Sequence, residues 1–380
     1  MITTINNKHN KLNVPNLRFK EFEGEWKEST IGEMFDLYSG NTPSRLNKEH
    51  FKGTVNWISS GELKEHYIYS SKEQISEEAA KSLKLLPVGT FVIAIYGLEA
   101  EGVRGTGSIT QEPSTISQAC MSFIPKGVIE NEFLYSWYKK HGNVIGIRYA
   151  QGTKQQNLSY DILEKFRIAY PNTKEQEKLN KFISLLDERI ATQSKIIEKM
   201  QTLIKGIAHK VSKQGKPNIR LSECLLCTSS TLQESDVAEV GAYPVYGANG
   251  IVGYLDTYNT TSEAIYIIKD GSGVGAVSCV KGKCSATGTL NILQTKEGFS
   301  LRYLYFILKV FSFEPYKTGM AIPHIYFKDY GKAKIYCPSN QLQCKYADLL
   351  SKIEQKATAE QKILDNLCSQ KQYLLCQMFI

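Results

Sequence analysis

Two long segments of the chain carry apolar residues in alternating steps of four and three positions, which is the spacing of a heptad seam. One segment follows Pro171 and the other follows Pro338, and a shift of 167 residues superposes them. Both segments therefore predict the same long helix. The predicted seam comprises Leu179, Ile183, Leu186, Ile190, Gln193, Ile197, Met200 and Ile204 in the first helix, and Leu350, Ile353, Ala357, Glu360, Leu364, Leu367 and Leu374 in the second.

Each helix is expected to start just after its proline, with Asn172 and Ser339 as caps. About 40 residues at 1.5 Å per residue make a rod of roughly 60 Å, and neither rod can bury its apolar stripe alone. Each stripe could pack on its own globular domain, but two copies of equal register favour pairing with each other. Copies related by a pseudo-two-fold axis meet antiparallel, which would bring Gln193 close to Glu360. We expect this polar layer to set the helix register.

Shorter patterns predict a mixed domain before each helix. Runs 90–96, 119–124, 264–268 and 275–280 are typical of strands, and 132–140 and 301–311 are typical of helices. The predicted fold class is α+β, with two mixed α/β domains in a tandem pseudo-two-fold repeat. Each domain is followed by a long helix, and the two helices form an antiparallel coiled coil. The expected divisions are 1–171 (with 1–20 an extended N-terminal segment), 172–215, 216–338 and 339–380.

Composition fits this organisation. The chain has 380 residues, 42% of them hydrophobic, enough for two or three domains with ordinary cores. Its net charge is +8, and residues 172–216 supply most of the surplus, with ten Lys and Arg against five Asp and Glu. This bias fits either a solvated helix face or contact with phosphates.

The lack of a recognisable targeting signal and the pattern of cysteine usage predict a cytoplasmic protein. Residues 1–20 lack an apolar signal core, and the apolar run 91–96 is too short for a bilayer, so we expect no membrane partner. The nine cysteines fit reduced thiols better than a disulfide framework. Cys224 and Cys227 with Cys279 and Cys284 could be taken for a zinc site, but their loose spacing favours buried thiols.

Motifs for catalysis are missing from the sequence. The glycine-rich segment 271–275 has strand-like runs on both sides and no helix start after it, so we do not interpret it as a phosphate loop. ATPase, zinc-peptidase and amino-methyltransferase signatures are absent, and the six histidines form no visible catalytic pair. We expect no catalytic residue and no metal site.

The loops carry the candidate binding residues. Arg and Lys suit guanine and phosphate, and Asn and Gln suit adenine, although the same side chains also occur in any solvated loop. The candidate DNA contacts in the first domain are Thr42, Ser44, Arg45, Tyr96, Arg104, Lys154, Gln155 and Gln156, and in the second Lys269, Ser272, Lys281, Lys283, Thr287, Lys317 and His324.

Together, the repeat and an ordered set of short motifs resemble the specificity subunit of a type I restriction-modification enzyme. The likeness covers nearly the whole chain. Two segments depart from it: Pro323-His324-Ile325 stands where Gln156-Asn157-Leu158 would repeat, and residues 271–289 are hard to align. The motifs in the first half are 13–19 with Trp26, 40–44 with Trp57-Ile58, Tyr96-Gly97, 117–120, 156–159 and 171–176. Those in the second half are 243–247, Asn249-Gly250, Gly253-Tyr254 and 269–271.

The resemblance implies two target-recognition domains that each grip half of a split site on double-stranded DNA. It implies an antiparallel helical spacer that holds two methyltransferase (M) subunits, with restriction/translocase (R) subunits joining for cleavage. S-adenosylmethionine, ATP and Mg²⁺ would be bound by those partners and not by this chain. A stand-alone metal-dependent DNA endonuclease and a coiled-coil adapter that does not bind DNA are the alternatives.

Overall fold

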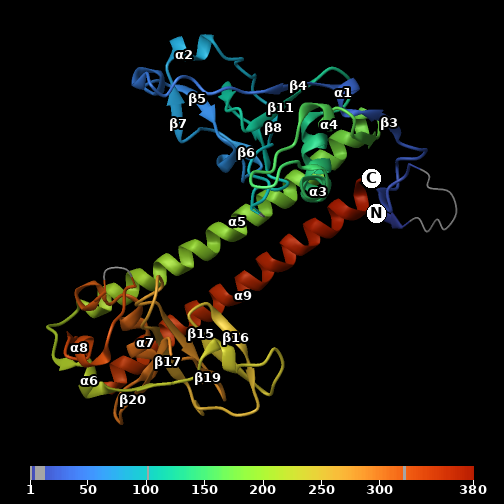
Figure 1. The fold of residues 1–380 in the computed structure, drawn as a ribbon. Coiled ribbons are helices and arrows are strands. Elements are labelled where there is room, and N and C mark those ends of the chain that lie inside the picture. The colour runs from blue at the N-terminus through green and yellow to red at the C-terminus, as the bar shows by residue number, and fades with distance from the viewer. Residues whose placement is uncertain (1, 5–12, 101, 320–321) are drawn as a thin grey trace. The chain divides into compact units, whose positions relative to one another are not determined.

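The computed structural model describes residues 2–4, 13–100, 102–319 and 322–380, which form two compact units. Unit 1 comprises Met1–Thr192 and Leu364–Ile380, and unit 2 comprises Gln193–Ile363. Each unit contains a globular head and parts of both long helices, α5 (Thr173–Ser212) and α9 (Asn340–Met378) (Figure 1). No helix of these described residues is long and apolar enough to cross a membrane.

The head of unit 1 is built on a five-stranded sheet in the order β4-β11-β8-β9-β6, beside a three-stranded sheet in the order β10-β5-β7. Helix α3 packs on β8, β9 and β11. The strands are β1 (Ile2–Thr4), β2 (Leu17–Phe19), β3 (Lys27–Thr30), β4 (Phe35–Ser39), β5 (Val55–Ile58), β6 (Tyr67–Ile68), β7 (Glu73–Ile75), β8 (Phe91–Ala94), β9 (Gly107–Thr110), β10 (Ser114–Ile116), β11 (Cys120–Pro125) and β12 (Arg167–Tyr170). The helices are α1 (Ile31–Met34), α2 (Glu77–Lys81), α3 (Asn131–Tyr149) and α4 (Tyr160–Leu163), with 3-10 turns η1 (Lys48–Phe51) and η2 (Ser60–Glu62).

The N-terminal segment 1–20 is only partly described. Residues 1 and 5–12, which belong to the predicted extended segment, lie outside the described residues. Strands β1 and β2 within it pair antiparallel.

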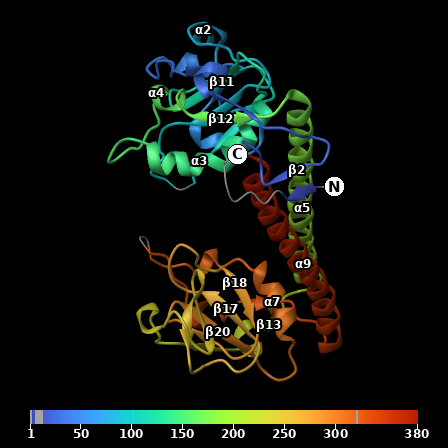
Figure 2. The same cartoon turned by 90° about the vertical axis from the view of Figure 1, so that its right-hand side faces the viewer.

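The head of unit 2 has a four-stranded sheet in the order β14-β20-β17-β18 and a three-stranded sheet in the order β16-β15-β19. Helix α7 lies against β17 and β18 (Figure 2). The strands are β13 (Ile219–Arg220), β14 (Leu225–Ser229), β15 (Tyr243–Gly247), β16 (Gly250–Leu255), β17 (Ala264–Ile268), β18 (Val277–Val280), β19 (Ser285–Ala286), β20 (Leu290–Thr295) and β21 (Lys334–Ile335). The helices are α6 (Leu221–Cys224), α7 (Leu301–Lys309) and α8 (Phe327–Tyr330), with 3-10 turns η3 (Glu234–Asp236) and η4 (Glu314–Tyr316).

The two heads repeat one order of elements. In each, a short strand pairs antiparallel with the strand that leads into the long helix, β3 with β12 and β13 with β21. A one-turn helix follows, and its third residue, Glu33 or Glu223, accepts a 2.7 Å hydrogen bond from the backbone N–H of Thr30 or Arg220. The predicted tandem repeat of mixed domains is confirmed.

A buried glutamine ties each long helix to its head. Gln176 donates to the carbonyl of Pro171 (3.0 Å) and accepts from the N–H of Glu130 (3.0 Å). Gln343 makes the same two bonds, to Pro338 (2.9 Å) and from Ser300 (3.0 Å). Because both groups of each amide are satisfied without water, these glutamines fix where each helix starts on its head.

Unit 1 adds a buried ion pair at the same place. Arg18 donates two hydrogen bonds to the carboxylate of Glu175, at 2.8 and 2.7 Å, and the Trp26 indole donates a third at 3.3 Å. The arginine and the glutamate are 5% and 1% exposed, so the pair is shielded from water. The Glu175 carboxylate therefore binds both Arg18, which belongs to motif 13–19, and Trp26.

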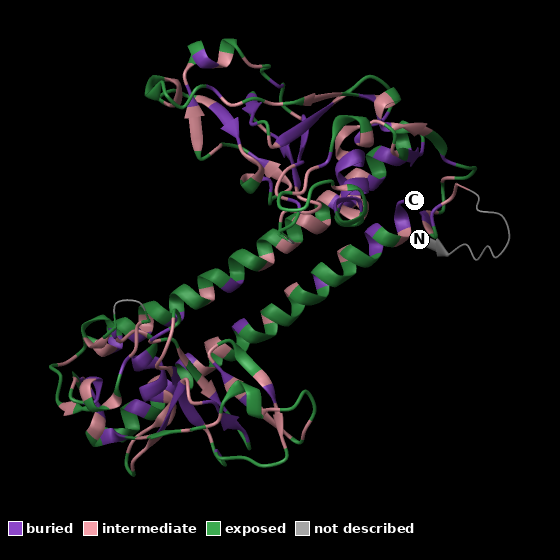
Figure 3. Ribbon diagram, in the orientation of Figure 1, coloured by how far each residue is buried: buried purple, intermediate pink, exposed green. Residues whose placement is uncertain are grey.

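Burial along α5 and α9 follows the predicted seam. Every predicted seam residue is buried or half-buried, and the opposite faces are exposed (Figure 3). In unit 2, Gln193 donates to the Glu360 carboxylate at 2.6 Å, and the Tyr346 hydroxyl donates to Gln214 at 2.7 Å. As residue numbers rise from Gln193 to Gln214, the numbers of their partners on α9 fall from Glu360 to Tyr346. The two helix segments of unit 2 are therefore antiparallel, as predicted.

The same pairing closes the core of unit 1. Leu179 and Ile183 of α5 share one hydrophobic cluster with Leu374 and Met378 of α9. Lys371, which occupies a seam position in the second helix, forms an ion pair with Asp187 of α5. The polar residue is tolerated in the seam because an opposite charge meets it.

Helix α3 is longer than the pattern predicted. The prediction ended at residue 140, before Gly142, whereas the helix runs to Tyr149. A Cβ at Gly142 would lie 2.8 Å from the Cα of Gly105, so the glycine permits close packing of a loop against the helix and does not end it.

The polar contact between Gln193 and Glu360 generates a stability prediction. Replacing both residues with Leu removes a half-buried polar pair, so we expect a higher melting temperature together with looser helix register. Thermal unfolding measures the first effect, and cysteine cross-linking at neighbouring seam positions measures the second. A lower melting temperature in the double variant would contradict this interpretation.

Candidate nucleic-acid interface

Two candidate loops of unit 1 leave the same edge of its five-stranded sheet. In the antiparallel register, Ser39 at the end of β4 faces Met121, and Ala94 at the end of β8 faces Cys120. Both strands therefore end beside the start of β11, and the loops 40–45 and 95–106 emerge there.

The third loop of unit 1, 151–157, is attached to the same edge by backbone hydrogen bonds. The Leu98 N–H donates to the Gln156 carbonyl at 3.1 Å, and the Leu158 N–H donates to the Ile95 carbonyl at 2.9 Å. The Glu99 carboxylate accepts the Gln156 N–H at 2.9 Å, and this hydrogen bond lowers the pKa of Glu99. The two loops thus form one layer.

Unit 2 repeats this layer with other side chains. Ile268 at the end of β17 faces Leu290, and Ser229 at the end of β14 faces Asn291, so the loops after both strands share one edge. The Gly271 N–H donates to the Pro323 carbonyl at 3.0 Å, and the Ile325 N–H donates to the Lys269 carbonyl at 2.9 Å. These two bonds correspond to the two backbone hydrogen bonds of unit 1.

A glycine forms the turn of each short loop. Gly152 has φ +113° and Gly319 has φ +88°, and a Cβ would lie 2.2 Å from the Gln155 carbonyl oxygen or 2.3 Å from that of Ile322. No other residue fits without moving the turn. His324 takes the place of Asn157, because each forms two isolated β-bridges. Those of His324 are to Thr318 and Asp270, and those of Asn157 are to Gln151 and Tyr96.

Five predicted contacts of unit 1 lie on this layer. Lys154 and Gln155 are exposed at the turn, and Gln156 and Tyr96 are half-buried beside it. Arg104 is half-buried and donates to the Leu98 carbonyl at 3.4 Å, while its Nε is buried without a hydrogen-bond partner.

The three other predicted contacts of unit 1 lie on the loop after β4. Ser44 is exposed, and the Thr42 N–H donates to the Asn41 side chain at 2.8 Å. Arg45 is held by two hydrogen bonds to Glu73, at 2.9 and 2.8 Å, and its guanidinium lies over the Phe51 ring. A contact with DNA through Arg45 would therefore compete with Glu73.

Four predicted contacts of unit 2 share the equivalent layer. Ser272 is exposed, whereas Lys269 is half-buried and pairs with Asp270 at 3.3 Å. Lys317 pairs with Glu314, and His324 is half-buried with its Nδ1 3.2 Å from the Ile322 carbonyl oxygen.

The remaining three predicted residues are placed differently. Lys281 and Lys283 follow β18, whose last residue Val280 faces Ala264 at the start of β17, so both lysines leave the opposite edge of the sheet. Thr287 is 1% exposed, and its hydroxyl pairs with that of Thr289 at 2.8 Å. A buried hydroxyl with a partner cannot reach a base edge, so Thr287 is a structural residue.

Sequence reasoning missed the loop after β14, residues 230–233. The Leu232 carbonyl in this loop accepts a hydrogen bond from the Gly288 N–H at 2.8 Å. The loop follows β14 as residues 40–43 follow β4 in unit 1, so the two loops correspond. The offset between α1 and α6 is 190 residues, whereas that between α5 and α9 is 167. A search that allowed the offset to change along the chain would have found this loop.

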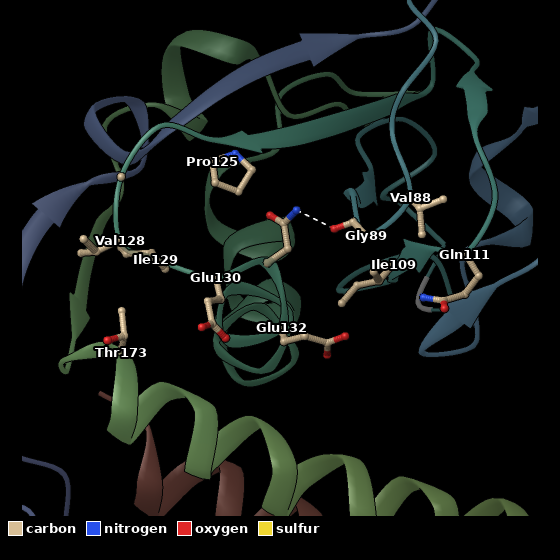
Figure 4. A pocket seen from close by; sticks show the side chains of 12 residues that line it. Val88, Gly89, Ile109, Gln111, Pro125, Val128, Ile129, Glu130, Glu132 and Thr173 are labelled. Atoms are coloured by element: carbon tan, nitrogen blue, oxygen red, sulfur yellow. Dashed lines mark hydrogen bonds between the residues drawn. The ribbon is translucent and has the colours of Figure 1, made fainter.

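One pocket of unit 1 is chemically unlike a phosphate site. Its volume is about 630 Å³, and Glu130 and Glu132 line it with Val88, Gln111 and Thr173 (Figure 4). Burial and the nearby charges of Glu177 and Glu132 raise the pKa of Glu130. No Lys or Arg occurs among the described residues that line it, so an anionic backbone would be repelled there.

Within the described part of the chain, no group of three or more His, Cys, Asp or Glu side chains is arranged so that it could hold a metal ion. All nine cysteines are free thiols, and burial raises the pKa of Cys120 and Cys224 to about 12. Such thiols remain protonated and unreactive at neutral pH.

The glycine turns generate a prediction with an internal control. Gly152→Ala should destabilise loop 151–157 because the Cβ strikes a carbonyl oxygen, whereas Gly97→Ala, also at positive φ but with open space, should cost only about 1–2 kcal/mol. Limited proteolysis and urea unfolding compare the two variants. Equal protease resistance of this loop in both would contradict the assignment.

The chain is similar to known restriction-modification proteins. It is 33% identical over 176 residues to the specificity subunit of the type I restriction enzyme EcoR124I/EcoR124II from Escherichia coli, covering 45% of this chain and 43% of that protein. It is 29% identical over 185 residues to the MjaIX specificity subunit from Methanocaldococcus jannaschii, covering 46% and 42%. The chain thus matches less than half the length of these two relatives.

The fold is similar to that of the S subunit of a type I restriction-modification system from M. genitalium. That crystal structure is 20% identical, has a TM-score of 0.65 and covers 97% of this chain and 99% of that one. The family model for the type I restriction modification DNA specificity domain matches residues 23–202 and 224–368. Because these two matches span both heads and most of both long helices, the chain belongs to the type I restriction-modification DNA specificity family.

Proposed function

We propose that this chain is the DNA-specificity subunit of a type I restriction-modification complex, in which each head binds one half of a bipartite site. The observation that carries the proposal is the repeated loop layer, in which equivalent backbone bonds support different side chains. The layer of unit 1 presents Lys154 and Gln155, and that of unit 2 presents Lys317 and His324 without an amide side chain at the equivalent turn. Amide side chains suit adenine, and cationic ones suit guanine or phosphate, so the two halves would bind different bases.

The proposal assigns the two heads to DNA and the long helices to proteins. The target-recognition domains are 1–171 and 216–338, and the spacer helices are 172–215 and 339–380. Exposed apolar side chains away from the seam, Leu185 and Leu203 on α5 and Leu349 and Tyr373 on α9, support contacts with partner helices. Two methyltransferase subunits would bind there, and restriction/translocase subunits would join for cleavage.

Chemistry is assigned to the partners. This chain would be non-catalytic, with S-adenosylmethionine, ATP and Mg²⁺ bound by the methyltransferase and restriction subunits. The alternative is a stand-alone metal-dependent nuclease. Magnesium-dependent DNA cutting by the purified single chain would support the nuclease instead.

Lysine substitutions test the proposed DNA surface. Lys154→Ala and Lys317→Ala should each weaken binding of the assembled methyltransferase to its site and lower the salt slope by about one, because a phosphate contact is lost. Lys281→Ala is the matched control, since Lys281 leaves the opposite sheet edge. Fluorescence anisotropy at several salt concentrations measures both quantities, and an equal loss for all three variants would contradict the assigned edge.

Spacer length tests whether the helices act as a ruler between half-sites. If α5 and α9 set a fixed spacing, the methyltransferase complex should modify the natural site and should fail on one lengthened by two base pairs. Methylation mapping of the host genome identifies the natural site, and transfer of a labelled methyl group to both duplexes measures the rates. Equal rates on both would disprove the ruler mechanism.

A further inference from the structure

A histidine of the unit 1 head lies between two tyrosine rings. The His66 ring is stacked on Tyr67, with centroids 4.0 Å apart and planes at 10°, and on Tyr135 at 3.9 Å and 3°. Its side chain is only 10% exposed. A ring held on both faces has a fixed orientation, so its two nitrogens point at defined partners.

Both partners are carboxylates. His66 Nε2 lies 2.9 Å from Oε2 of Glu132, and Nδ1 lies 3.1 Å from Oδ2 of Asp187. Neutral imidazole carries one N–H, so it can donate to only one of them and would turn a lone pair toward the other. The imidazolium donates to both, and the flanking tyrosine faces also favour a cation.

These contacts join four elements of unit 1. His66 belongs to the loop between η2 and β6, Glu132 belongs to α3, Asp187 belongs to α5, and Asp187 also pairs with Lys371 of α9. The histidine therefore contacts α5 directly and α9 through one shared carboxylate. Without its charge, Asp187 and Glu132 would lose the cation between them.

Unit 2 has an equivalent contact built on a different cation. Arg302, Tyr305 and Lys309 of α7 stand where Glu132, Tyr135 and Lys139 stand on α3, and Glu354 of α9 stands where Asp187 stands on α5. Arg302 bonds Glu263 at 2.7 Å and Glu354 at 3.3 Å, and the Tyr305 hydroxyl donates to Glu354 at 2.7 Å. Arginine remains charged at all physiological pH values, whereas histidine does not.

We propose that protonated His66 is a latch that fastens the first head to the long helices, and that the second head, which uses Arg302, is insensitive to pH over the same range. Raising the pH neutralises His66, removes one hydrogen bond to a carboxylate and loosens loop 59–66 from α5. This inference goes beyond the proposed function, and it stands or falls without reference to DNA.

The surrounding charges support the cationic state. The titratable groups around the ring are Glu65, Tyr67, Glu132, Tyr135, Lys139, Asp187 and Lys371. Burial would lower the pKa of His66, but the hydrogen bonds and charges of Asp187 and Glu132 outweigh it and raise the pKa above 6.5. The stabilisation is therefore complete below pH 6.5 and is lost as pH rises through the raised value.

Lys139 acts in the opposite direction at higher pH. Burial and the nearby Lys371 lower the pKa of Lys139 to about 8, so the stability of unit 1 rises with pH between about 8 and 10.5. Lys139 therefore does not contribute between pH 6 and 8, and experiments above pH 8 would mix the two effects.

Protonation of the ring is measured directly by NMR. Full-length chain labelled with ¹⁵N-histidine is titrated from pH 5.5 to 8.5, with the His66 signal assigned through His66→Gln and the exposed His209 as a reference. We expect the two ring nitrogens of His66 to report the imidazolium at pH 6.5. A neutral ring at that pH would overturn the proposal without requiring any variant to be stable.

Hydrogen exchange measures the latch. At pH 6, His66→Gln should exchange severalfold faster than the parent in segment 59–66 and at the end of α9, and the difference should shrink at pH 8. His66→Arg, which keeps a cation able to donate to two carboxylates, should behave alike at both pH values. Peptides of α7 in unit 2 are the internal control and should not change. A parent-to-variant ratio that stays constant between pH 6 and 8 would contradict the latch.

Discussion

The structure depends on one constraint, which is that neither long helix can bury its apolar seam by itself. Each head closes its core with segments from both helices. Leu179 and Leu374 belong to the core of unit 1, and Ile204 and Leu350 belong to that of unit 2. Burying one such side chain is worth about 1.5–3 kcal/mol, so a head that lost either segment would lose a large part of its marginal stability. Head folding and helix pairing are therefore one process.

The polar positions of the seam explain how the pairing is selected. An apolar seam alone tolerates a shift by one heptad, because Leu and Ile pack in similar ways at successive layers. The pair Gln193 and Glu360 in unit 2 and the pair Asp187 and Lys371 in unit 1 have partners only in the observed register. A shift would leave a half-buried charge or amide without its partner, which costs more than a lost apolar contact. These polar positions therefore select the helix register, although they contribute little to the free energy of unfolding.

The repeat and the helices were predictable because they rest on periodicity, which the order of residues carries directly. The burial of the seam and the contact between Gln193 and Glu360 followed from it. The site was less predictable, because placement depends on sheet register. Lys269 and Lys281 are similar residues twelve positions apart, yet they leave opposite edges because β18 reverses direction. Thr287 is buried and Arg45 is held by Glu73 for reasons that involve partners distant in sequence. The His66 cluster joins four separate segments and had no local signal.

The loop layer shows how two heads can differ in what they bind while keeping one fold. The bonds that the two layers share run between backbone groups, such as Leu98 N–H to Gln156 O and Gly271 N–H to Pro323 O. Backbone bonds do not depend on the side chain, so Gln156 and Pro323 occupy equivalent places. The turn glycines are restricted, because a Cβ there meets a carbonyl oxygen. Side chains beside those glycines can therefore change without a change in the fold.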